Sequence, residues 1–224
     1  MKTKLSFCFF LFLICSFISL NSLFAQVTDK DGHTCKTLKI GTQEWLGENL
    51  NVGHYLNGDV IPQVQDSAAW AKLKTGAWCY YNYKSGDHVV KGKLYNYYAI
   101  EDKRGLLPVG YKIADVWDDW IQVDKWLHEG MDKFSGEDTN KIRLFMGADL
   151  LTQDCWKNKS YYREGNGHFG SLSSIGFWWL PGDKMDMTYT FGRCTGSDGA
   201  YFGYAEQPDW KNYGFAIRCY KDIK

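Results

Sequence analysis

The chain has 224 residues, with 26 Lys and Arg against 26 Asp and Glu, and this balance excludes the strongly basic surface that nucleic acid or anionic lipid requires. Its length suits a single domain with one sizeable core. Aromatic residues make up 17% of the chain and include ten Trp, so we expect a core built largely from rings. Rings left at the surface would suit a binding site.

Residues 1–25 have the layout of a secretory signal peptide, with Lys2 and Lys4 before an apolar run and small Ala25 at the expected cut. An uncleaved membrane anchor is the alternative, but no basic stop-transfer cluster follows the run. Cys15 lies within that run behind bulky residues, which disfavours lipid attachment. We therefore expect cleavage, no membrane insertion, and export to the periplasm, the outer surface or the medium.

The expected mature domain, residues 26–224, carries 24 basic and 26 acidic residues once the two leader lysines are removed, a formal charge of −2. Its five cysteines are an odd number, so at least one is unpaired or pairs outside the chain. No CxxC pair is present, which disfavours a zinc knuckle or a thioredoxin-type redox site. Two disulfide pairings stay open as guesses: Cys155 with Cys194, and Cys79 with Cys219.

In the first half of the domain, alternation predicts a strand over 36–45 that is interrupted at Gly41, followed by a loop over 47–61. Asp66 can cap a short helix that runs to Leu73 and is ended by Gly76. Aromatic runs predict strand or edge segments at 78–81 and 94–98.

The strongest helix prediction is 116–128, capped by Asp115, with an apolar stripe at Val116, Trp120, Val123 and Leu127. A weaker helix is expected from about Thr139. Beyond residue 152, short strands are predicted at 175–180, 188–193, 200–205 and 214–220, and 157–171 is expected to be a long loop. Burial is expected for Trp45, Leu94, Tyr95, Trp120, Phe215 and Ile217.

Six ordered blocks resemble those of the Fibrobacter succinogenes major paralogous domain: GTQEWLGENL (41–50), YYN (80–82), GKLYNYYA (92–99), LPVGYKI (107–113), GFWW (176–179) and GFAIRC (214–219). The resemblance implies a secreted protein of Bacteroidetes or Fibrobacteres. It also implies an α+β, C-type lectin-like fold, with twisted antiparallel sheets, one or two helices and long loops. Leu107 stands where the family usually has Cys, so a typical family disulfide is absent or rewired.

No cofactor is expected. Glu206, Gln207 and Asp209 supply oxygens of the kind that Ca²⁺ takes, but the Trp-Asn-Asp triplet that follows in calcium-dependent lectins is incomplete here, so a polar turn is the preferred interpretation. The five histidines lack HExxH or Cys-His spacing. Glu44 and Glu48 resemble a glycosidase pair only in spacing, and Glu48 is expected to cap backbone amides.

The resemblance implies a ligand site on long loops, here 157–171 and 195–213. Rings and hydrogen-bonding groups in these stretches suit a sugar or a peptide edge. The leading hypothesis is a non-enzymatic binding domain for carbohydrate or protein. The alternatives are an exported enzyme, either of the formylglycine-generating branch of the fold or a hydrolase, and a purely structural surface protein. The candidate ligand-binding residues are Tyr161, Tyr162, His168, Tyr201, Tyr204, Glu206, Asp209 and Trp210.

Overall fold

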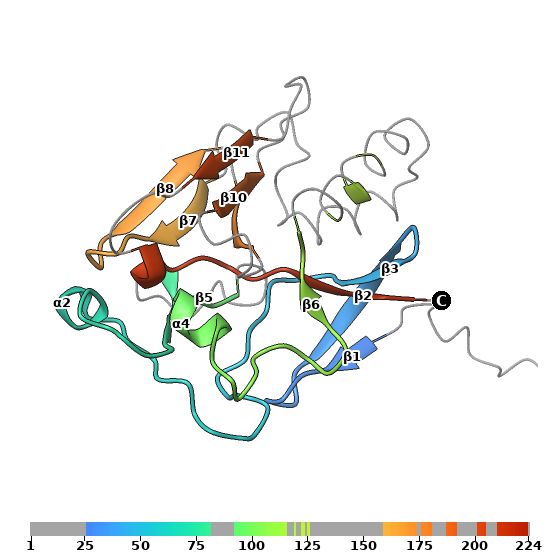
Figure 1. Cartoon of the computed structure of the whole chain (residues 1–224), viewed down its shortest axis with the longest axis horizontal. Coiled ribbons are helices and arrows are strands. Elements are labelled where there is room, and N and C mark those ends of the chain that lie inside the picture. The colour runs from blue at the N-terminus through green and yellow to red at the C-terminus, as the bar shows by residue number, and fades with distance from the viewer. Residues whose placement is uncertain are drawn as a thin grey trace, which may run out of the picture.

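The computed structural model describes residues 26–81, 92–115, 119, 122–123, 125, 159–173, 176–180, 187–191, 201–204 and 210–223. These ranges combine short helices with antiparallel sheets, so the protein is α+β as predicted (Figure 1). Among the described residues, no helix is both long enough and apolar enough to cross a membrane.

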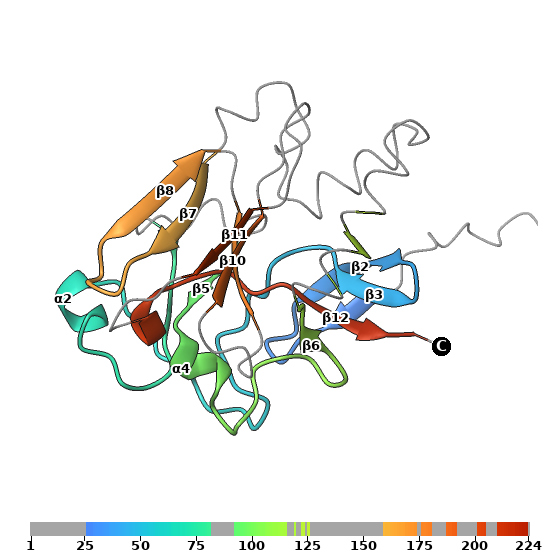
Figure 2. The ribbon, with the colours of Figure 1, turned by 45° about the horizontal axis from the view of Figure 1, so that its top comes forward.

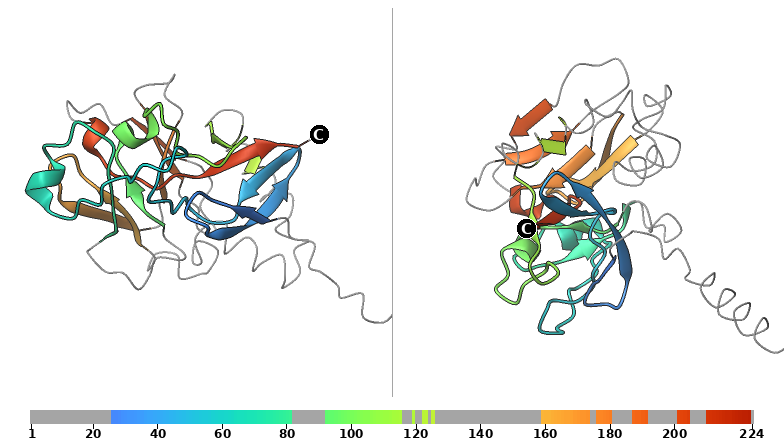
Figure 3. Two further views of the ribbon diagram at one scale, coloured as in Figure 1. Left: turned by 90° about the horizontal axis from the view of Figure 1, so that it is seen from below. Right: turned by 90° about the vertical axis from the view of Figure 1, so that its right-hand side faces the viewer.

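A five-stranded antiparallel sheet joins the beginning of the described chain to its end (Figure 2). The predicted interruption at Gly41 is a tight turn, where φ is +59°, a conformation that glycine adopts without steric cost. This sheet and helix α2 lie at opposite ends of the molecule (Figure 3). In spatial order, the strands are β1 (Gln26–Thr28), β2 (Thr34–Ile40), β3 (Gln43–Leu46), β12 (Cys219–Asp222) and β6 (Lys112–Ile113).

The remaining strands among the described residues form three smaller antiparallel sheets, which the segment 214–216 connects. In this segment Phe215 bridges to Tyr95 of β5, and Gly214 and Ala216 bridge to β7 and β9. The chain before β12 is therefore held in the middle of the fold. The strands of these sheets are β4 (Trp78–Cys79) with β5 (Leu94–Tyr95), β7 (Lys159–Arg163) with β8 (Phe169–Ser173), and β9 (Gly176–Trp179) with β10 (Met187–Phe191) and β11 (Tyr201–Tyr204).

Side-chain caps begin the short helices. In α2 (Ser67–Trp70) the Asp66 carboxylate accepts the Ala69 N–H at 2.8 Å, as predicted, although the helix ends at Trp70 rather than Leu73. The prediction of a strand through Tyr97 and Tyr98 is wrong, because α4 (Tyr97–Ile100) begins there. Its cap, Asn96, accepts the N–H groups of Ala77 and Ala99 at 2.9 and 3.2 Å.

The predicted loop over 157–171 is also wrong, because most of it forms the β7–β8 hairpin. Gly170 lies under the Tyr162 ring, where a Cβ atom would collide with it, so glycine here accommodates a cross-strand neighbour. The predicted strand at 214–220 is displaced: isolated bridges occupy 214–216, and regular pairing begins at Cys219.

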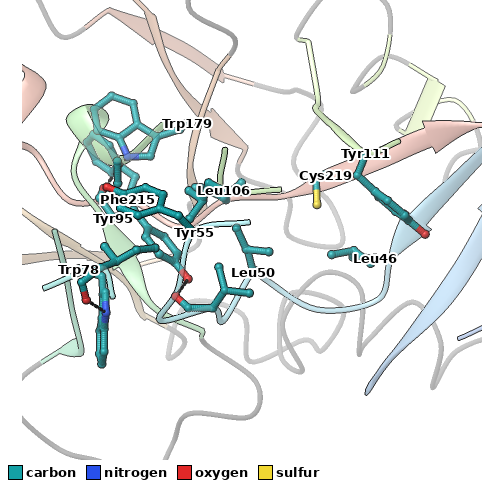
Figure 4. Close-up of a cluster of buried hydrophobic side chains, with 14 of the residues drawn as sticks. Leu46, Leu50, Tyr55, Trp78, Tyr95, Leu106, Tyr111, Trp179, Phe215 and Cys219 are labelled. Atoms are coloured by element: carbon teal, nitrogen blue, oxygen red, sulfur yellow. Dashed lines mark hydrogen bonds between the residues drawn. The ribbon is translucent and has the colours of Figure 1, made fainter. Parts of the chain in front are cut away.

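Within the part of the chain that the structure describes, the core consists of two clusters of buried side chains, one of which is drawn in Figure 4. Trp45, Tyr95 and Ile217 are fully buried, while Leu94 and Phe215 are 4% and 2% exposed, which confirms these five predictions. Trp120 lies outside the described residues, as do Val116, Leu127 and the weaker helix from Thr139. Within the predicted helix 116–128, residues 122, 123 and 125 are helical, and Val123 is fully buried.

One of the two proposed disulfides is not formed, and both of its cysteines are free thiols. Cys79 and Cys219 are both unbridged, and they belong to different core clusters, which is why they do not meet. Cys35 is also a free, buried thiol. Cys155 and Cys194, the other proposed pair, lie outside the described residues.

Candidate functional site

Two of the predicted ligand-binding rings pack against the same aromatic cluster. The half-buried Tyr162 ring stacks on Phe215, with centroids 6.0 Å apart and planes inclined by 27°. The half-buried Trp210 lies in the 3₁₀-helix η5 (Trp210–Asn212), and its ring centroid is 4.7 Å from Tyr97 and 6.4 Å from Trp179. Because Trp179 also contacts Phe215 edge-on at 4.7 Å, these rings form one connected group.

None of the other predicted site residues has a described ring contact with this cluster. His168 is exposed in the β7–β8 turn, where its N–H donates to Asn166 Oδ1 at 2.9 Å. The backbone of Tyr161 lies in β7, and the backbones of Tyr201 and Tyr204 lie in β11, without described side chains. Glu206, Gln207 and Asp209 fall outside the described residues, so the calcium hypothesis stays a prediction.

A charged pair borders the Trp210 ring, and sequence analysis did not identify it. Lys211 Nζ lies 2.6 Å from Glu101 Oε2, and both side chains are partly exposed, at 34% and 41%. The same ammonium lies 5.6 Å from the ring centroids of both Trp210 and Tyr98. Cation–π attraction operates at such distances. We define the Trp210 surface as Tyr98, Glu101, Trp210 and Lys211.

Helix packing brings the Trp210 surface together. Tyr98 lies in α4 and Glu101 follows it as the C-cap, whereas Trp210 and Lys211 belong to η5, more than a hundred residues later. The two short helices lie side by side in Figures 1 and 2. The buried Trp179 ring supports this packing from the core. The surface therefore combines flat apolar faces with charged groups on a fixed base.

The described cysteines do not form a reactive pair. Burial raises the pKa of the Cys79 thiol to about 11, although a hydrogen bond from Arg163 acts in the opposite direction. Burial likewise raises the pKa of Cys219 to about 12 and that of Cys35 beyond its ordinary range. Because the thiolate is the reactive form, these three residues do not fit a thiol oxidase site.

The two carboxylates considered as a hydrolase pair have separate partners. Tyr111 Oη donates to Glu44 Oε1 at 2.7 Å, and Lys221 Nζ lies 2.8 Å from the same oxygen. Burial alone would raise the pKa of Glu44, but the Lys221 and Tyr111 hydrogen bonds lower it overall. Glu48, expected to cap backbone amides, instead lies against His33 and Cys35. Glu44 is therefore an anion held by structural partners, and these differ from the partners of Glu48.

Sequence analysis did not identify two further features of the structure, an apolar groove and a group of potential metal ligands. An open apolar groove of about 390 Å³ runs along residues 105–111, with Leu56 and Ile100 on its walls. The ligating atoms of His33, Cys35 and Glu48 all lie within 4.8 Å of one another. The signal for this group was the alternation of His33 and Cys35 on one strand face, but the partner Glu48 emerges only from strand register.

Fold and core together define an α+β domain whose motif blocks supply buried side chains, including Trp45, Tyr95 and Phe215. The family model of the Fibrobacter succinogenes major domain matches residues 38–221, and the chain belongs to this family. No curated protein and no solved structure matches the chain significantly. The motif blocks that carry the family resemblance therefore contribute residues to the core.

Proposed function

We propose that this chain is an exported, non-enzymatic binding domain of C-type lectin-like architecture, and that the Trp210 surface takes a carbohydrate or polypeptide ligand. The observation that carries the proposal is the Lys211 ammonium, held between two partly exposed rings and 2.6 Å from the Glu101 carboxylate. The leader-like residues 1–25 support export.

The Trp210 surface combines the two features that a sugar or peptide site needs, ring faces for stacking and polar groups for hydrogen bonding. Ring faces of Trp210 and Tyr98 can stack against the apolar face of a pyranose or against a peptide side chain. Lys211 supplies donors and Glu101 supplies acceptors, which can orient hydroxyl or amide groups. Because both charged side chains remain partly exposed, a ligand reaches them without unfolding the site.

The direct test is a glycan array and a pull-down of exported proteins, both probed with the protein produced from its full sequence. Lys211→Ala and Tyr98→Ala remove the two members that anchor the core least. Each should weaken binding about 5- to 10-fold, since an exposed cation–π or charged hydrogen bond contributes on the order of 1 kcal/mol.

Lys112→Ala is the matched control. Lys112 also pairs with a carboxylate, Asp222 at 2.9 Å, and lies 4.7 Å from the centroid of a ring, Tyr220, but on the five-stranded sheet. Binding unchanged by Lys112→Ala and weakened by Lys211→Ala supports the proposal. Equal effects of the two variants, or no ligand in either screen at high protein concentration, would contradict it and favour a purely structural role.

A further inference from the structure

Three different metal-ligand side chains meet where the β1–β2 hairpin contacts the end of β3. His33 Nε2 lies 3.2 Å from Glu48 Oε1, and Cys35 Sγ lies within 4.8 Å of both. The Cys35 side chain is 3% exposed, and the Glu48 side chain is 13% exposed. The His33 side chain, 38% exposed, forms the solvent side of the cluster.

Strand geometry explains why these three residues converge. His33 directly precedes β2 and Cys35 is its second residue, so the two side chains point to the same face two positions apart. In the antiparallel register Thr37 pairs with Leu46, and the hydrogen bond from Gly47 N–H to Lys36 O extends that ladder. Continuing by one more residue places Glu48 opposite Cys35.

The turn that presents His33 is held by Asp29. Its Oδ1 accepts the N–H groups of Asp31 and His33 at 3.0 and 2.9 Å. Its Oδ2 is buried and has no hydrogen-bond partner within the described part of the chain, and Asp29 as a whole is 8% exposed. Asp29 is close enough to interact electrostatically with His33 and Cys35. A buried, unpaired carboxylate oxygen beside this cluster is a second indication of a missing positively charged or hydrated group.

From these observations we infer that His33, Cys35 and Glu48 form a binding site for a thiophilic divalent cation of the zinc type. Zinc binds imidazole nitrogen, thiolate sulfur and carboxylate oxygen, and it leaves one tetrahedral position for water when three protein ligands are present. With nitrogen and oxygen ligands about 2.1 Å from the metal, their mutual separation in a tetrahedron is about 3.4 Å, close to the observed separation of 3.2 Å.

Charge also favours a divalent cation here. Although burial disfavours the free thiolate, coordination to the ion releases the thiol proton, and the resulting Cys35 thiolate and the Glu48 carboxylate together neutralise the two positive charges of the ion. The nearby Arg218 guanidinium interacts electrostatically with Glu48 and Cys35, and Asp29 interacts electrostatically with Cys35.

The neighbouring acidic residue does not belong to the site. Asp31 Oδ1 lies 2.7 Å from His54 Nδ1, and its Oδ2 accepts the Gly53 N–H at 2.6 Å. Both oxygens therefore join the hairpin turn to the loop at 53–54. A calcium loop over 29–33 is disfavoured for the same reason, since calcium requires several free oxygen ligands.

The test uses the protein produced from its full sequence, purified with a tag free of histidine, reduced, and stripped with a chelator. Zn²⁺ uptake is measured by competition with a chromophoric chelator, and Co²⁺ is used as a spectroscopic probe of the ligands. We expect one Zn²⁺ per chain and a thiolate-to-cobalt charge-transfer band. Cys35→Ser should abolish that band, while His33→Gln and Glu48→Gln should weaken Zn²⁺ affinity at least 10-fold.

His54→Gln is the matched control, because His54 is another partly exposed histidine paired with a carboxylate nearby, and its variant should bind as the wild type does. His33→Gln changes a side chain at the protein surface and so tests the site even if Cys35→Ser fails to fold. No Zn²⁺ uptake, a cobalt complex without a thiolate band, or affinities of His33→Gln and Glu48→Gln within twofold of the wild type would overturn the inference.

Discussion

Arg163 is a fully buried charge whose removal should destabilise the fold strongly. Its guanidinium donates to three carbonyl groups: Val64 at 2.8 Å, Gln65 at 2.7 Å and Gly167 at 3.1 Å. It also lies between two rings, with its central carbon 4.5 Å from the Trp70 centroid and 4.7 Å from the Phe169 centroid. Arg163 thereby fastens the β7–β8 hairpin to the chain before α2.

The expected cost follows from these contacts. Arg163→Met keeps an apolar stem between the rings but leaves three carbonyl groups without their donor. A buried acceptor left unpaired costs about 1–3 kcal/mol. Because the Gly167 hydrogen bond is buried and the Val64 and Gln65 hydrogen bonds are partly buried, the expected total is about 3–5 kcal/mol. Arg163→Lys keeps the positive charge but loses the fork-shaped set of donors. Its free energy of unfolding should therefore lie between those of the wild type and Arg163→Met.

Urea unfolding monitored by tryptophan fluorescence measures these differences. The matched control is Arg104→Met, because Arg104 also lies over a ring, 4.0 Å from the Tyr55 centroid, and pairs with carboxylates of Asp59 and Asp102, but its side chain is 38% exposed. Arg104→Met should cost about 0–1 kcal/mol. If Arg163→Met costs no more than Arg104→Met, the reasoning that these three carbonyl groups need their donor is refuted.

Three further predictions concern stability. Trp45→Ala removes a fully buried ring and should cost about 3–5 kcal/mol in urea unfolding, whereas a cost below about 1 kcal/mol would place Trp45 outside the core. Gly167→Ala should lower the melting temperature more than Gly110→Ala. The backbone φ is positive at both glycines, but only at Gly167 would a Cβ atom collide with the backbone of α2. Equal shifts in melting temperature would contradict this close approach of Gly167 to α2. Hydrogen bonds from Arg104 lower the pKa of Asp102 from 3.8 to about 2, so this stabilisation is present above pH 3.8 and is lost as the pH falls toward 2. Asp102→Asn should flatten the plot of unfolding free energy against pH in this range. An unchanged plot would contradict the pairing of Asp102 with Arg104.

Local sequence signals predicted the elements whose partners are close in the chain. Gly41 marked the β2–β3 turn and Asp66 marked the start of α2, because turns and caps depend on neighbouring residues. The segment after Asn96 was misassigned since its aromatic residues favour strands, while the Asn96 cap that starts α4 also depends on the distant Ala77. The stretch 157–171 was predicted to be a loop, whereas its Gly170 is explained only by the ring of Tyr162 across the hairpin.

Both candidate sites show the same limit. Trp210 was predicted because the family resemblance implies a site on long loops and because rings and polar groups gather in 195–213, but Lys211, Tyr98 and Glu101 join it only through the packing of α4 on η5. In the second site, the spacing of His33 and Cys35 matched no metal motif, and Glu48 reaches them through strand register. Contacts between segments distant in sequence leave no local pattern, so the sequence alone indicated Trp210 but assembled neither site.

The central claim, that the Trp210 surface binds ligand, is tested most directly by NMR titration of the ¹⁵N-labelled protein with the strongest ligand from the screens. The indole signals of Trp210 and Trp45 are assigned from Trp→Phe variants. We expect saturable shifts of the Trp210 indole and the Lys211 amide, with no shift of the fully buried Trp45 indole in the five-stranded sheet. Saturable shifts confined to that sheet or to the groove at 105–111, with the Trp210 and Lys211 signals unmoved, would contradict the account.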